Sequence, residues 1–217
     1  MRIFRMPIWL HRIYPRYIWR IPTQQQNLYL SFDDGPDPEV TPYVLDLLDA
    51  FNAKATFFCV GDNIARFPEV LQDILKRGHQ LGNHTQHHIK GWSTELQDYC
   101  ADVEKCQNHI GPISQFPLFR PPYGRIRSDQ GKILLSKGYS CIMWDILSYD
   151  YDKRLNTSVA LRKIIQRSRP GSIVVFHDSQ KAKKQLKQLL PEYLQEMKNR
   201  GYSFKCISNN YDHTEKP

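Results

Sequence analysis

The chain has 217 residues, of which 41% are apolar and 24% charged, and its formal net charge is +8 at pH 7. These values are ordinary for one globular domain with a sizeable core. No stretch approaches the run of about 18 apolar residues that a membrane-spanning helix needs, so we expect no such helix. The five cysteines are an odd number without a CxxC pair, which favours a reducing compartment over a disulfide framework.

The first 22 residues, MRIFRMPIWLHRIYPRYIWRIP, carry five arginines and no acid, so most of the basic excess is local. Their longest apolar run is far shorter than the about 7–15 residues of a signal-peptide core. Two interpretations stay open. The segment is either a basic strap packed on the outside of the domain, anchored by Trp9 and Trp19, or it contacts an anionic membrane surface. We therefore expect a cytoplasmic protein or one peripheral on the inner membrane face, and no nucleic-acid partner.

Beyond this lead segment, residues 1–26, apolar runs alternate with amphipathic segments. The strand-like runs are Leu28–Phe32, Ala55–Val60, a short one in HQLGNH after Gly78, Leu118–Phe119, Tyr139–Trp144, Ser172–Phe176 and Ser203–Ile207. Helical spacing of apolar residues marks 40–52, 67–78, 93–111, 128–138, 157–168 and 183–201. Repeated strand–helix units predict a parallel sheet, either a barrel or a doubly wound sheet, in a single domain of residues 27–208. Residues 209–217 are expected to be a frayed tail.

Ionisable residues follow most of these runs. Asp33 and Asp34 end the first, HTQHH follows the third, Arg120 the fourth, and His177 the sixth, while MWDILSYDYD lies within and after the fifth. In βα barrels, chemistry collects where strands end and loops begin. Any one of these groups alone would be an ordinary turn or structural residue. Because the ends of parallel strands share one face, the whole set predicts an active site there.

The HTQHH segment predicts a metal site. His84 and His88 are four residues apart, a spacing that places both on one face of a helical turn. Asp34 supplies a third ligand, and two nitrogens with one carboxylate oxygen suit Zn²⁺, although other divalent ions remain possible. His87 does not share this spacing, so it is not expected to bind the metal. Asp33 is then left free beside the metal, where a carboxylate can act as general base toward a water.

Three further groups complete the predicted chemistry. Arg120 is expected to hold Asp33 ionised, as an opposite charge within a few ångströms does. Pro121 and Pro122 have no N–H, so Tyr123 provides the first backbone donor for a developing oxyanion. His177 is the expected general acid for the leaving group.

Four motifs in this order resemble those of the polysaccharide deacetylase family, also called the NodB-homology domain or carbohydrate esterase family 4: SFDDGP, HTQHH, RPPYG and VFH. The resemblance implies a distorted (β/α)7 barrel. It also implies that Asp33 is the base, that Asp34, His84 and His88 are the metal ligands, and that Arg120 steadies the base. By the same resemblance, the Tyr123 N–H is an oxyanion donor, Val175 belongs to the acetyl pocket, and His177 is the acid.

The family's remaining motif departs from its usual D-x-x-D-W and reads LSYDY here. Leu147 stands where the family has the first Asp, which normally pairs with the catalytic His. Asp150 matches the second Asp, and Tyr151 stands in place of the Trp that forms an aromatic wall. Without an acidic partner, His177 would be harder to keep protonated. Asp145 or Asp150 would have to supply that charge, and the sequence does not decide between them.

The resemblance implies a metal-dependent hydrolase that removes N-acetyl groups from the amino sugars of a polysaccharide or oligosaccharide. Its cofactor would be one divalent ion, Zn²⁺ first, with Co²⁺, Ni²⁺ or Mn²⁺ as alternatives, and its partner an acetylated glycan. Two other functions stay open: an O-acetyl carbohydrate esterase, because the same groups can cleave an ester, and a weakened barrel that only binds glycan, for which Leu147 is the main support.

Overall fold

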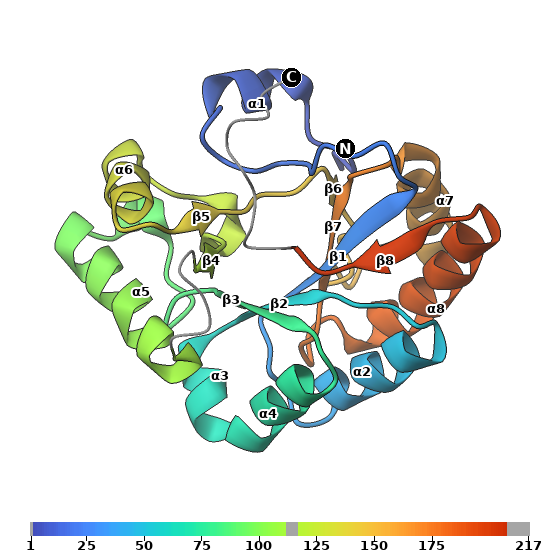
Figure 1. The fold of residues 1–217 in the computed structure, drawn as a ribbon, viewed down its shortest axis with the longest axis horizontal. Helices are drawn as coiled ribbons and strands as arrows, with labels where there is room; N and C mark the ends of the chain where they lie inside the picture. Colours follow the sequence, from blue (N-terminus) through green and yellow to red (C-terminus); the bar gives the residue numbers. More distant parts are fainter. Residues whose placement is uncertain (1, 112–116, 208–217) are drawn as a thin grey trace.

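The computed structural model describes residues 2–111 and 117–207. Within them, seven parallel strands follow the order β5-β4-β3-β2-β1-β7-β6, and β8 pairs with the start of β1 (Figure 1). The strands are β1 (Asn27–Asp33), β2 (Thr56–Cys59), β3 (Gln80–Asn83), β4 (Leu118–Phe119), β5 (Ser140–Cys141), β6 (Ile146–Leu147), β7 (Ile173–His177) and β8 (Ser203–Lys205). This curled sheet confirms the predicted single-domain α/β barrel of seven strands. The predicted tail, residues 209–217, lies outside the described residues.

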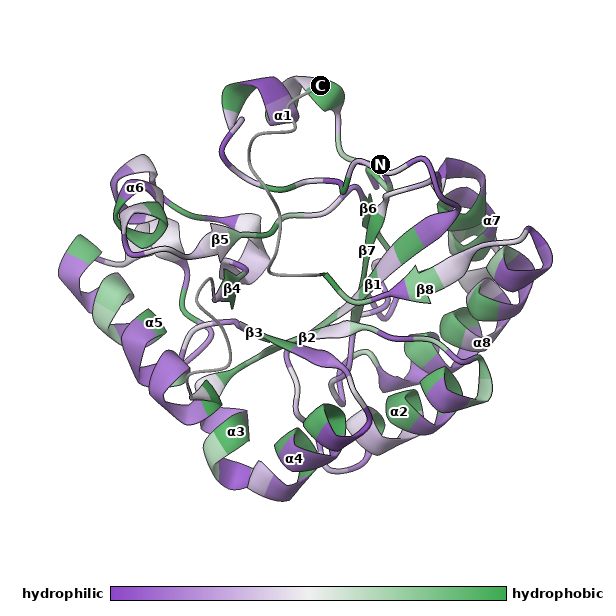
Figure 2. Ribbon diagram, viewed as in Figure 1, coloured by the Kyte–Doolittle hydropathy of each residue, from purple (hydrophilic) through white to green (hydrophobic). Residues whose placement is uncertain are grey.

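A ring of helices covers the outer face of the sheet (Figure 1). They are α2 (Val40–Ala50), α3 (Gly61–Arg66), α4 (Pro68–Lys76), α5 (Leu96–Ile110), α6 (Ser128–Ser136), α7 (Thr157–Arg167) and α8 (Lys183–Asn199), with 3₁₀ turns η1 (Gly91–Ser93) and η2 (Pro122–Gly124). Apolar and polar residues alternate along these helices (Figure 2). In α8, for example, Leu186, Leu190 and Leu194 recur at helical spacing and are fully buried.

Alternation along β1 directs the site residues into the barrel. Leu28, Leu30 and Phe32 belong to the main core beneath the helices. Successive side chains of a strand point to opposite faces, so Ser31 and Asp33 point inward. The strand therefore stabilises the fold with one face and presents functional groups with the other.

The sequence prediction misjudged β5 and missed β6, and its seventh run, Ser203–Ile207, contains β8, which lies off the seven-strand path. Tyr139–Trp144 was expected to be continuous, but only Ser140–Cys141 is β5, and the chain then crosses to form β6 at the other end of the path. The lead segment lies between these two edges: Ile18 N–H donates to Cys141 O (2.9 Å) and Leu147 N–H donates to Phe4 O (3.1 Å). An edge strand needs partners for its backbone groups, and the lead supplies them here.

The lead segment carries the short helix α1 (Ile8–Ile13), which lies at the rim of the molecule between α6 and α7 (Figure 1). Of the two tryptophans expected as anchors, Trp19 is buried at 6% exposure, whereas Trp9 is 56% exposed. The segment is thus packed at its ends and open in its middle. Among the described residues, no helix combines the length and apolarity needed to cross a bilayer.

Candidate active site

Asp33 and His177 face each other across neighbouring strands. The parallel register pairs Asp33 with His177, and Ser31 with Val175. Paired residues of adjacent parallel strands point to the same face and lie about 5 Å apart. The two groups predicted as base and acid therefore come together at the carboxyl ends of β1 and β7, with Val175 buried one level deeper.

Arg120 is fully buried just past β4 and holds Asp33. One of its terminal nitrogens donates to Asp33 Oδ1 (2.6 Å) and to Ser31 Oγ (2.8 Å). Its other N–H groups donate to the carbonyls of Ile142 and Met143 (3.2 and 3.0 Å). With its guanidinium fixed on several sides, Arg120 orients the Asp33 carboxylate inside the barrel.

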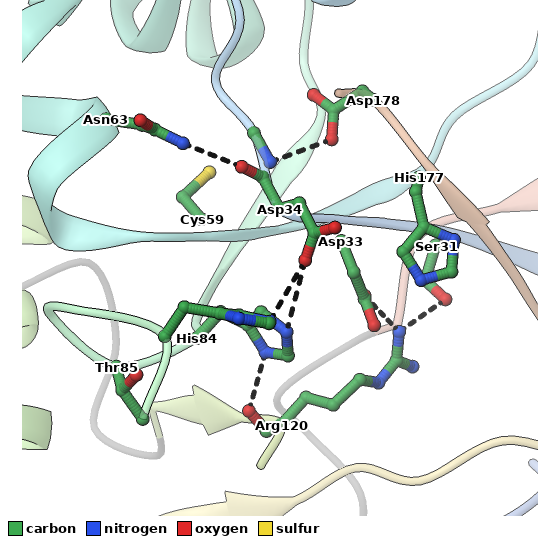
Figure 3. A network of polar contacts seen from close by, with 12 residues as sticks. Ser31, Asp33, Asp34, Cys59, Asn63, His84, Thr85, Arg120, His177 and Asp178 are labelled. Atoms are coloured by element: carbon green, nitrogen blue, oxygen red, sulfur yellow. Dashed lines mark hydrogen bonds and ion pairs between the residues drawn. The ribbon is translucent and has the colours of Figure 1, made fainter. Parts of the chain in front are cut away.

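Asp34, His84 and His88 bring three ligand atoms within 4.8 Å of one another (Figure 3). Asp34 Oδ1 lies 3.1 Å from His88 Nε2 and 3.8 Å from His84 Nε2. His87, which was not expected to bind the metal, instead bonds the carboxylate of Asp102. The structure therefore groups the three ligands that the sequence predicted and turns the neighbouring histidine away.

The chemistry of these three groups fits a divalent metal. His84 Nδ1 lies 2.7 Å from the Arg120 carbonyl, so it donates its proton there and leaves Nε2 free as a ligand. Burial lowers the pKa of His84 to about 4, which keeps the imidazole neutral at pH 7. Burial would raise the pKa of Asp34, but the hydrogen bond with His88 and the nearby imidazoles hold it well below its ordinary value. Two imidazole nitrogens and one carboxylate oxygen form a ligand set that Zn²⁺ takes in catalytic sites.

Asp150 is the acidic partner of His177. Its Oδ1 lies 2.7 Å from His177 Nδ1, its Oδ2 accepts the His177 backbone N–H (2.8 Å), and Ser148 Oγ donates to Oδ1 (2.9 Å). Burial would lower the pKa of His177, but the Asp150 charge outweighs it and raises the pKa to about 9. Asp145, the other candidate, pairs with Arg5 and Arg169 instead. The substitution at Leu147 therefore leaves His177 with a carboxylate.

The remaining predicted residues surround this centre. The Tyr123 ring lies 4.7 Å from that of His88, and the Tyr151 ring lies 4.9 Å from that of His177. Backbone hydrogen bonds around η2 are made by Gly124 and Arg125, whereas the Tyr123 N–H donates to no other described residue. It is therefore available for a developing oxyanion.

Backbone strain concentrates at this centre. Among the described residues, six non-glycine positions have positive φ, and five of them belong to or adjoin the site: Asp34, Thr85, His88, Tyr123 and Tyr149. Such conformations cost about 1–3 kcal/mol each and persist only where neighbours enforce them. The site is thus maintained at the expense of local stability.

Two residues that the sequence prediction missed support the Asp34 turn (Figure 3). Asp178, fully buried directly after His177, accepts the Gly35 N–H (3.1 Å), and Asn63 Nδ2 donates to the Asp34 carbonyl (2.8 Å). Asp178 lies so close that a Cβ on Gly35 would be 2.1 Å from its Oδ2, so only glycine fits. Asp178 directly follows the predicted acid His177, which was a signal in the sequence, whereas nothing in the sequence distinguishes Asn63.

A comparison with known families identifies the chain. The family model described as polysaccharide deacetylase matches residues 20–142. The chain belongs to the polysaccharide deacetylase family. This confirms the resemblance seen in the four motifs, and it assigns the chain to a family of carbohydrate deacetylases, which are hydrolases.

Individual members of the polysaccharide deacetylase family match over most of the chain. A peptidoglycan-N-acetylglucosamine deacetylase of Bacillus cereus is 34% identical over 195 residues, covering 88% of this chain and 90% of the relative. A chitooligosaccharide deacetylase of Azorhizobium caulinodans is 32% identical, covering 73% and 77%. The crystal structure of a peptidoglycan N-acetylglucosamine deacetylase superimposes with a TM-score of 0.83 at 27% identity, covering 91% and 94%.

Proposed function

We propose that this chain removes N-acetyl groups from the amino sugars of a glycan, by hydrolysis that depends on a divalent metal. The observation that carries the proposal is the convergence of three units at one end of the barrel: Asp33 with Arg120, His177 with Asp150, and the Asp34–His84–His88 cluster. A barrel that only binds glycan needs none of these. Relatives that act on peptidoglycan and on chitooligosaccharides support an acetylated amino sugar as the substrate.

Each residue has one task in this mechanism. A divalent ion held by Asp34, His84 and His88 would polarise the acetyl carbonyl and acidify a water, as metal ions of such sites do. Asp33, held in place by Arg120, accepts the proton of the attacking water. The Tyr123 N–H donates to the developing oxyanion.

His177 completes the reaction by donating its proton to the departing amine. Asp150 keeps that proton on the imidazole at neutral pH. Tyr151, next to His177, forms a wall of the site, and Val175 lies beneath it on the same face of the sheet. These roles also explain why the fold tolerates Leu147, because the carboxylate that His177 needs comes from Asp150.

The proposal is tested by acetate release. With Zn²⁺ added, the protein is expected to release acetate from N-acetylglucosamine oligomers. Chelation followed by dialysis should abolish the release, because the site then lacks the ion that would polarise the carbonyl. Returning Zn²⁺, Co²⁺, Ni²⁺ or Mn²⁺ one at a time identifies the metal that restores the rate best. Release from acetylated xylan alone would assign the chain to O-deacetylation, and release from neither glycan would reject the hydrolase.

We also propose that the lead segment contacts an anionic lipid surface. On α1 the side chains of Ile8, Trp9 and Ile13 are 64%, 56% and 58% exposed, and the exposed Arg12 lies between them on the same face. Amphipathic helices with an aromatic and basic face insert at the headgroup boundary, and each basic residue there adds about 1 kcal/mol. The named relatives give no support for the inner membrane face in particular, so the proposal concerns only the chemistry of the surface.

Vesicle sedimentation tests this contact. The protein is expected to sediment with phosphatidylglycerol vesicles more than with phosphatidylcholine vesicles, and less as salt rises, because screening weakens the attraction. Replacing Trp9 and Ile13 by Ser should abolish the difference, whereas Arg154→Ala, at an exposed position of another loop, should not. Equal sedimentation of the double variant and the wild type would reject the contact.

A further inference from the structure

Two exposed aromatic side chains lie on the loops that follow β3 and β4, and one of them, Tyr123, contacts the His88 ring at 4.7 Å. Outside the lead segment, Trp92 and Tyr123 are the only large hydrophobic residues among the described ones that are classed as exposed, at 62% and 54%. Trp92 lies on η1, which follows the ligand loop after β3, and Tyr123 lies on η2, after β4. Both rings are open to a ligand.

Trp92 is held on a rigid base. Its indole N–H donates to the Ile126 carbonyl (3.2 Å), and the buried Gln130 donates to the carbonyls of Gly91 and Thr94 (2.9 Å each), which fixes η1 against α6. The backbone contact is so close that a Cβ on Gly91 would lie 2.6 Å from the Arg125 carbonyl. The ring is therefore preorganised, and little conformational entropy is lost when a ligand covers it.

Each exposed ring has a cation beside it. Arg125 Cζ lies 5.0 Å from the Trp92 ring centre, and Lys90 Nζ lies 5.3 Å from that of Tyr123. Both cations are exposed, and neither forms an ion pair with a carboxylate of the described residues. Both cations are therefore available to bind a ligand that packs against these two rings.

We propose that Trp92, Lys90 and Arg125 form a subsite for a sugar that carries a carboxylate, next to the amino sugar that loses its acetyl group. Aromatic faces pack against the apolar C–H face of a sugar ring, and a guanidinium binds a carboxylate in a fork geometry. The inference rests on the proposed function and narrows its substrate to an acidic glycan, such as one whose alternate amino sugars bear a lactyl carboxylate. A neutral glycan would use the aromatic rings but leave both cations unused.

The test compares one glycan in two charge states. Oligomers of alternating N-acetylglucosamine and N-acetylmuramic acid are assayed for acetate release as they are and after amidation of their carboxylates. The wild type is expected to have the lower KM for the acidic form. Arg125→Ala and Lys90→Ala should each raise that KM about fivefold relative to the KM of the amidated form, the size expected for an exposed ion pair. Trp92→Ala should raise KM for both forms, roughly fivefold, with kcat little changed.

A matched control is Lys198→Ala, which removes a lysine that lies 5.4 Å from the Phe51 ring on another face of the molecule and should change neither KM. Equal KM values of the wild type for the two forms, or equal effects of Arg125→Ala on both, would overturn the subsite. If no glycan releases acetate, the proposed function fails separately. The dissociation constants of the same two oligomers, measured by calorimetry for the wild type and Arg125→Ala, then decide whether the subsite exists.

Discussion

Replacing Asp33 by Asn is expected to lower kcat by roughly 10²–10⁴-fold, the range that a positioned general base contributes. The Asn side chain has nearly the same shape but cannot take a proton from water. The metal cluster contains Asp34 and not Asp33, so Zn²⁺ affinity should remain within a few-fold of the wild type. Acetate release and metal titration on the same preparation give both quantities.

The same substitution has a predictable cost in stability, because it leaves the fully buried Arg120 guanidinium without its counter-charge. Removing one partner of a buried pair typically costs about 3–5 kcal/mol, so a lower midpoint of urea unfolding is expected. Glu196→Gln, which breaks an exposed pair with Arg200 on α8, is the control and should change neither activity nor midpoint measurably. A folded, metal-loaded Asp33→Asn protein with wild-type kcat would refute the assignment of the base.

The residues at the strand ends could be predicted because their signals are local. In β1 the alternation of Leu28, Leu30 and Phe32 defines the buried face, and Asp33 follows on the opposite face. The spacing of His84 and His88 is likewise a short-range pattern. Their convergence required only that the strands be parallel, since parallel strands end at one face.

The edge strand β6 could not be predicted in the same way. Ile146–Leu147 is too short to show any period, and its edge position depends on pairing with Phe4, more than 140 residues away. The exposure of the middle of the lead segment could not be predicted from the sequence either. Trp9 and Trp19 have the same composition around them, and only tertiary contacts bury one and expose the other.

The partner of His177 depended on a turn. Asp145 and Asp150 are both near β6 in sequence, but the Asp145 backbone N–H donates to Ile173 O, four residues before His177 on β7. At about 3.3 Å per residue that is roughly 13 Å along the strand. Tyr149, with φ of 59°, turns the chain so that Asp150 reaches His177 instead. A positive φ at a tyrosine is not readable from sequence, because it is enforced by packing against the lead.

This geometry leads to the second large effect, on the pH dependence of Asp150→Asn. His177 acts as an acid only while protonated, and its pKa of about 9 means that wild-type kcat/KM should fall as pH rises through about 9. The Asn side chain lacks the charge that raises this pKa, so burial would bring it to 6.5 or below. At pH 8 the protonated fraction would then fall roughly 30-fold or more, and the rate with it. The two proteins should converge only as pH falls below the lowered pKa of His177 in the variant.

Rate profiles of kcat/KM between pH 5.5 and 10 test this, with Asp145→Asn as the matched control. Asp145 is also fully buried, but it binds Arg5, Arg169 and Ser172 instead of His177. Its substitution should therefore lower the unfolding midpoint without moving the alkaline limb, whereas Asp150→Asn should move the limb toward neutral pH. If both variants kept the wild-type limb, a group other than His177 would be the acid. If only Asp145→Asn moved the alkaline limb, Asp145 and not Asp150 would be the carboxylate that raises the pKa of His177.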